Sequence, residues 1–307
     1  MSIFHKVYKS PVVLGLIVLL LAISAGAFVF FRSGTPDAYY GFPKPHFSKG
    51  LNLVFIADSY PSRSEFETDI SLIRDALKEA EPWRSYERYN FYEIFPYRAD
   101  FCGVQTENFR HPTLVCDDGK INKYLTKIKT DGPYKLVVLS RQSFESWATV
   151  SRIANSGIFF SLPPNAAGDG YSYHVQFLHL FGHAFGLKDE ELFAIAKAGS
   201  PDTKPDGPNC APDKATAKDW WGDLVASSTG VGYFKGCVGN KEYIKPTDGS
   251  LMNMNELSKL TFSYGPVSER YLRKILDYCF SNKASTASND PAFFAQYPEF
   301  GICASGK

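Results

Sequence analysis

The chain has 307 residues, enough for one large domain or two small ones, and 44% of them are hydrophobic and 21% charged, as in an ordinary globular protein. Its formal net charge of +1 argues against a general binder of nucleic acid or of other acidic polymers. The 25 Phe and 18 Tyr would suit either a thick core or a substrate groove, so composition by itself assigns no function.

The N-terminal segment predicts an exported protein. Basic residues precede an apolar run from Val12 to Phe31, which Arg32 closes. The run is about 20 residues long, enough to span a bilayer and more than the roughly 7–15 of a cleavable signal core. A signal anchor is therefore the preferred interpretation of residues 1–32, and the small residues at 22–27 leave a cleaved signal peptide as the alternative. The basic residues favour a cytoplasmic N-terminus, with the rest of the chain outside.

After a linker at 33–49 that is rich in Gly, Pro and Tyr, the sequence alternates strand and helix patterns. Ser62 and Glu65 fit a capping box at the start of the first helix. The alternation predicts an α/β domain at 50–280 with a mixed, mostly parallel sheet, followed by an irregular tail at 281–307. The predicted strands are 51–58, 90–97 and 134–140, with a hairpin at 148–162, and the predicted helices are 62–81, 121–128, 171 onwards and 267–280.

Two segments have competing structural and functional interpretations. The hairpin at 148–162 precedes the helix that carries His179 and His183. The preferred interpretation is that its strands are purely structural, and the alternative is that its edge pairs with the substrate backbone. The stretch at 199–249, rich in Pro, Gly and Asp, is expected to form long loops around the cleft that these two histidines would line. Trp220 and Trp221 within it are expected to pack in a core rather than to line a substrate wall, because tryptophan buries a large area.

The six cysteines, an even number in a chain expected to be exported, indicate disulfides, with buried free thiols as the alternative. None of them forms a C-x-x-C pair, so a zinc site made of cysteines is not expected. Proximity in the sequence favours the pairs Cys102–Cys116, Cys210–Cys237 and Cys279–Cys303, and other pairings remain open.

The most informative stretch reads H-x-x-x-H-x-x-G-x-x-D, from His179 through His183 and Gly186 to Asp189. Histidines four residues apart on a helix lie on one face, one turn from each other. Glycine is the residue preferred where a helix ends in a left-handed turn, after which Asp189 can fold back toward the histidines. Two His nitrogens and one carboxylate oxygen make a three-ligand zinc site with a fourth position open to water.

One residue separates this pattern from a zinc-peptidase signature. The residue after the first His should be Glu, and here it is Leu180. In zinc peptidases that Glu takes a proton from the metal-bound water and returns it to the leaving amine, which a leucine cannot do. General acid–base catalysis contributes about 10²–10⁴ in rate, so a loss of at least that order is expected.

The chain resembles the IgA-peptidase family of zinc metallopeptidases (peptidase family M64), from about residue 52 to residue 276. The resemblance implies a zincin-like (metzincin-like) fold with an active-site helix and one zinc ion bound by His179, His183 and Asp189. It also implies that a methionine of the closing block lies beneath the site. The blocks that carry it are 52–60, 66–90, the metal block 177–190, and the closing segments 243–246, 250–252 and 264–267.

The chain also departs from this family. Leu180 stands where the family has its catalytic Glu, and the spacing from His183 to Asp189 is one residue shorter than in many members. Glu190 and Glu191 therefore remain alternative third ligands, although helix geometry places neither where the lost base would be.

Three functions remain open. The preferred one is an exported, M64-like zinc-binding protein, a pseudopeptidase or weakly active enzyme that binds or slowly cleaves peptide or protein ligands. The second is an active zinc metalloendopeptidase whose base comes from elsewhere in the fold, and the third is a metal-free structural or binding ectodomain. In each case the domain lies outside the cytoplasm, anchored to the membrane by the N-terminal segment or released by cleavage, and nucleic acid is not a partner.

Overall fold

In a computed structural model the chain divides into two compact units, Met1–Tyr39 and Tyr40–Lys307. The predicted membrane-spanning run and the C-terminal tail lie outside the described residues, and none of the described helices is long and apolar enough to cross a membrane. The structure describes residues 37–97, 99–105, 113–142, 149–151, 157–161, 170–191, 207–253 and 261–280.

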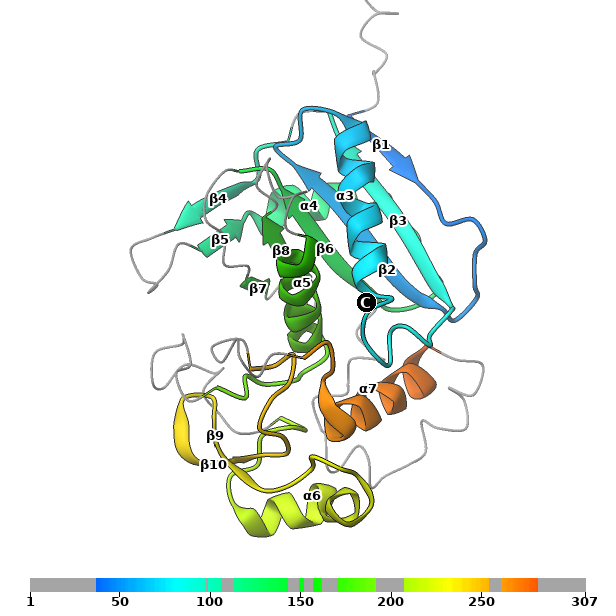
Figure 1. Cartoon of the computed structure of the whole chain (residues 1–307). Coiled ribbons are helices and arrows are strands. Elements are labelled where there is room, and N and C mark those ends of the chain that lie inside the picture. Colours follow the sequence, from blue (N-terminus) through cyan, green and yellow to red (C-terminus); the bar gives the residue numbers. More distant parts are fainter. Residues whose placement is uncertain are drawn as a thin grey trace, which may run out of the picture. The chain divides into compact units, whose positions relative to one another are not determined.

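A six-stranded sheet organises the described part of the chain, with strand order β1-β3-β2-β6-β8-β7 (Figure 1). Strand β2 pairs in parallel with β3 and β6, and β6 pairs in parallel with β8, whereas β7 and β8 are antiparallel. The prediction of an α/β fold with a mixed, mostly parallel sheet is therefore confirmed. The strands are β1 Ala38–Gly41, β2 Leu51–Asp58, β3 Tyr89–Pro96, β6 Tyr134–Ser140, β7 Thr149–Ser151 and β8 Gly157–Ser161.

Strand β2 is buried along its whole length, as its nearly continuous apolar sequence predicts for a central parallel strand. Helices α3 (Arg63–Ala76) and α5 (Gly170–Ala184) pack side by side against the sheet (Figure 1). Helix α3 begins after Ser62, whose hydroxyl accepts a hydrogen bond from the Glu65 N–H, so the predicted N-cap is confirmed. The helix ends at Ala76, earlier than predicted, and turns occupy the residues from there to Pro82.

A small ribbon follows β3. Strands β4 (Cys102–Gln105) and β5 (Thr113–Cys116) pair antiparallel, and the predicted disulfide Cys102–Cys116 joins them with an S–S distance of 2.02 Å. Helix α4 (Asp118–Leu125) then leads to β6 and buries Ile121 on its inner face.

The region between α5 and the last helix differs from the expectation of long loops. It contains helix α6 (Lys214–Ser227) and the hairpin β9 (Phe234–Cys237) and β10 (Asn240–Lys245). The expectation was wrong there because α6 is kinked at Trp221 (φ −143°), so its apolar residues do not follow one long helical period. The predicted final helix is confirmed as α7 (Gly265–Cys279).

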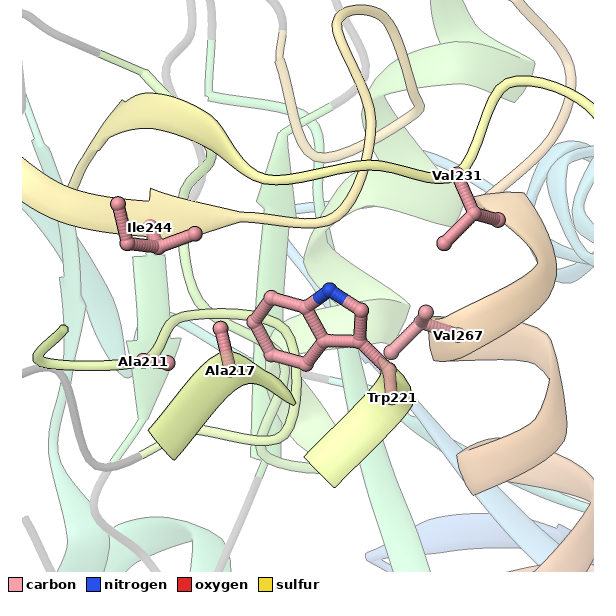
Figure 2. Packing of buried hydrophobic residues seen from close by; sticks show 6 residues of the cluster. All are labelled: Ala211, Ala217, Trp221, Val231, Ile244 and Val267. Atoms are coloured by element: carbon pink, nitrogen blue, oxygen red, sulfur yellow. The ribbon is translucent and has the colours of Figure 1, made fainter. Parts of the chain in front are cut away.

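Trp221 lies at the centre of a cluster of buried hydrophobic residues between α6, β10 and α7 (Figure 2). Its side chain is fully buried, and its indole N–H donates to the Gly232 carbonyl at 3.0 Å. The prediction that it packs in a core is therefore confirmed. The residues packed around it are Ala211, Ala217, Val231, Ile244 and Val267.

The second predicted disulfide, Cys210–Cys237, is also present and ties the segment before α6 to the end of β9. The third predicted pair includes Cys303, which lies outside the described residues. Two disulfides indicate an oxidising compartment outside the cytoplasm.

Candidate metal centre

The candidate site lies at the C-terminal end of α5, where His179 and His183 occupy the last two turns. Gly186 follows with a φ of +89°, a left-handed conformation that glycine adopts without steric cost. Its N–H donates to the His183 carbonyl, and the N–H of Leu187 donates to the Gly182 carbonyl, which is the Schellman pattern of helix termination. The chain therefore reverses at the position that the sequence predicts.

This reversal brings Asp189 back to the two histidines. Nε2 of His183 lies 3.0 Å from Nε2 of His179 and 3.0 Å from Oδ1 of Asp189, and Nε2 of His179 lies 3.2 Å from that oxygen. The two imidazole planes are nearly perpendicular, at 89°. The side chains are 12%, 20% and 28% exposed for His179, His183 and Asp189, so the site is screened but still reached by solvent.

Backbone carbonyls orient both imidazoles. Nδ1 of His179 lies 2.8 Å from the carbonyl oxygen of Leu251, and Nδ1 of His183 lies 2.8 Å from that of Leu187. Each Nδ1 therefore carries a proton and donates it, so the neutral form of each imidazole has its lone pair on Nε2. In that form two lone pairs and a carboxylate oxygen face one another, an arrangement that is repulsive unless a metal ion or a proton lies between them.

The spacing of the three atoms fits a metal ion. Ligand atoms about 2.0–2.1 Å from a tetrahedral zinc lie about 3.3 Å from one another. The three observed separations, 3.0, 3.0 and 3.2 Å, form one nearly equilateral face of such a tetrahedron. Within the described part of the chain, His179, His183 and Asp189 are the group that could hold a metal ion.

His183 and Asp189 each shift the pKa of the other. Burial by itself would lower the pKa of His183, but the Asp189 carboxylate and the Leu187 carbonyl raise it overall. Without a metal ion, burial would raise the pKa of Asp189, but the charge of a protonated His183 and the contacts of both imidazoles with the carboxylate hold that pKa well below its usual range. Asp189 is therefore ionised, as a metal ligand must be.

Glu190, the alternative third ligand, has its carboxylate engaged with other groups. Oε1 accepts a hydrogen bond from Asn209 at 3.0 Å, and Oε2 accepts hydrogen bonds from Thr247 and Ser250 at 2.9 Å each. Burial raises the pKa of Glu190, and these hydrogen bonds oppose that shift. Glu191 lies outside the group that could hold a metal ion. Sequence reasoning missed this role of Glu190, because its donors are 19 to 60 residues away in the chain.

Leu180 belongs to α5, the ligand helix that carries His179 and His183, and Met252 packs against this helix. Leu180 is buried, with 7% of its surface exposed. Met252 is fully buried, and a Cβ added to Gly182 would lie 2.7 Å from its sulfur. Gly182 stands between the two histidines in sequence, so its lack of a side chain is what admits the methionine against this stretch of α5.

The fold and the site together define an α/β protein with a two-histidine, one-aspartate group suited to a metal ion. No protein-family model matches the sequence, and the search of curated proteins found no match. Function therefore has to be argued from the site itself.

Proposed function

We propose that this protein is an exported zinc-binding ectodomain with a zincin-like, M64-like fold that binds peptides and lacks efficient peptidase activity. The observation that carries the proposal is the convergence of His179, His183 and Asp189, with both imidazoles presenting Nε2. Two His and one carboxylate with an open fourth position form the ligand type of catalytic zinc sites. Met252 beneath the ligand helix supports the same family.

Leu180 sets the limit on catalysis. Bound zinc would supply Lewis acidity and would lower the pKa of its water to about 7. His179, His183 and Asp189 would hold such an ion through Nε2 and a carboxylate oxygen, and none of them would then be free to move a proton. Leu180 follows the first histidine with a hydrocarbon side chain, so it offers no proton acceptor where the signature has Glu.

The first test is metal content. The purified ectodomain is expected to contain about one zinc ion per chain or, after chelation, to take one up at micromolar free zinc. The double variant His179→Ala/His183→Ala is the control and is expected to take up none. A wild-type protein that binds no zinc would support the metal-free alternative, in which a proton on His183 bridges to Asp189 instead.

The second test restores the missing group. Leu180→Glu is expected to raise chelator-sensitive cleavage of a peptide library by about 10²–10⁴ over wild type, the range of a general base. Leu180→Gln is the matched control, because it has the same shape as Glu without a basic carboxylate. Equal and robust cleavage by wild type and Leu180→Glu would show that another base serves the site, and the pseudopeptidase assignment would fail.

The location is part of the proposal. The two disulfides point to an extracytoplasmic compartment. The apolar run from Val12 to Phe31 would anchor the domain to the membrane, or would be removed as a signal peptide. N-terminal sequencing of the protein isolated from membrane and soluble fractions separates the two.

A further inference from the structure

Glu190 is a fully buried carboxylate next to a metal-ligand candidate, and it accepts hydrogen bonds from three side chains of two other segments. These donors are Asn209, Thr247 and Ser250, at 2.9–3.0 Å. Burying a carboxylate costs free energy unless hydrogen-bond donors replace the water that it loses. Glu190 has such donors on both of its carboxylate oxygens.

The backbone of Glu190 is fastened to the second of these segments as well. Its N–H donates to the Met252 carbonyl at 2.8 Å, and its own carbonyl accepts from Nζ of Lys245 at 2.8 Å. Glu190 thus joins three stretches of chain, namely its own loop, the segment around Asn209, and residues 245–252.

The same stretches orient the candidate ligands. Asn209 brackets Lys188, accepting from its N–H and donating to its carbonyl at 2.8 Å each, one residue before Asp189. The carbonyl of Leu251, between Ser250 and Met252, accepts from Nδ1 of His179. The contacts that hold the Asn209 segment and residues 245–252 against the ligand loop, residues 187–190, therefore orient both the Asp189 carboxylate and the His179 imidazole.

We infer that Glu190 is a positioning residue of the metal site. Its carboxylate holds the ligand loop and the Leu251 carbonyl in the one arrangement that directs Asp189 and His179 to a shared ion. This inference rests on the zinc site proposed above. Outer groups that orient metal ligands typically contribute about 10–100-fold in metal affinity.

The test is zinc affinity of the full ectodomain, measured by competition with a chromophoric chelator. Glu190→Ala is expected to raise the zinc Kd about 10–100-fold. Glu190→Gln is expected to recover most of the affinity, because its amide oxygen still accepts from Asn209 and its amide nitrogen can donate to the rotatable hydroxyls of Thr247 and Ser250. Cobalt(II) in place of zinc reports the geometry, and Glu190→Ala is expected to change the visible cobalt bands.

The matched control is Asp58→Ala. Asp58 is also fully buried and accepts hydrogen bonds from the N–H groups of Phe101 and Cys102 and from the Ser140 hydroxyl, at the end of β2. Its loss is expected to destabilise the fold without changing the zinc Kd. If both alanine variants change the Kd equally, the effect of Glu190 is general destabilisation and the inference fails.

If Glu190→Ala does not fold, Ser250→Ala and Thr247→Val each remove a single donor and are expected to raise the Kd several-fold. Unchanged Kd and cobalt spectra in the folded variants would overturn the positioning role while leaving the proposed zinc site intact. A wild-type protein that binds no zinc would instead overturn both.

Discussion

Lys135 on β6 is a fully buried lysine that lies under the end of the ligand helix. Its Nζ donates to the Ala184 carbonyl at 2.7 Å and lies 4.7 Å from the centre of the Phe185 ring. A cation near the C-terminus of a helix is favourable, since the last carbonyls carry partial negative charge. Burial nevertheless lowers the pKa of this lysine to about 7 from its ordinary value of 10.5.

This shift predicts a pH dependence of stability. Between pH 7 and about 10 the unfolded chain holds a proton on Lys135 that the folded chain does not, so the free energy of unfolding rises with pH. Below pH 7 both states are protonated and the cost of burying the charge is fully present. Relative to Lys135→Met, wild type is therefore expected to gain at most about 1.4 kcal/mol per pH unit from pH 7 to 9. Urea unfolding of both proteins at several pH values measures this, and a flat difference would contradict it.

At the scale of elements, the disulfide Cys210–Cys237 lies beside two contacts of the ligand loop. Cys210 follows Asn209, which brackets Lys188, and Cys237 precedes Val238, whose N–H donates to the Asp189 carbonyl at 2.9 Å. The bond therefore holds together the two segments that flank the loop. The other disulfide joins β4 and β5 and makes none of these contacts.

The two disulfides are expected to differ in their effect on zinc binding. Replacing both cysteines of either pair by serine is expected to cost about 2–5 kcal/mol of stability. Only the Cys210→Ser/Cys237→Ser variant is expected also to raise the zinc Kd, by about tenfold. In this variant the contacts of Asn209 with Lys188 and of Val238 with Asp189 are no longer held by the disulfide. Chemical unfolding and chelator competition on both variants separate the effects. A Kd that rises equally in the Cys102→Ser/Cys116→Ser variant would refute the local role.

At the scale of the whole molecule, a metal that binds only the folded state must stabilise it. With free zinc at 100 times its Kd, the expected gain is about 2.7 kcal/mol. For a domain of this size that corresponds to a rise in Tm of roughly 5–10 °C, reversed by chelator. Calorimetry with and without zinc measures the shift, with His179→Ala/His183→Ala as the control that is expected to show none. An unchanged wild-type Tm would argue against a folded-state metal site.

The elements that the sequence predicts well are those whose pattern is local. The central strands at 51–58 and 134–140 are short apolar runs, and they form β2 and β6 with the predicted bounds. Ser62 begins α3 because its side chain caps a nearby N–H. Helix α6 was missed because tertiary packing around Trp221, rather than a regular apolar period, supports it.

The candidate metal site likewise has some features that follow from local sequence and others that depend on tertiary packing. The sequence by itself determined that His179 and His183 share a helix face, that glycine turns the chain after them, and that Leu180 stands in the proton-transfer position, because these follow from residues at most ten apart. Only the tertiary structure decided that Asp189 rather than Glu190 meets the histidines, and that Leu251 orients His179 from 72 residues away. Hydrogen bonds between segments so distant in the chain depend on how the loops pack, and no local pattern records that.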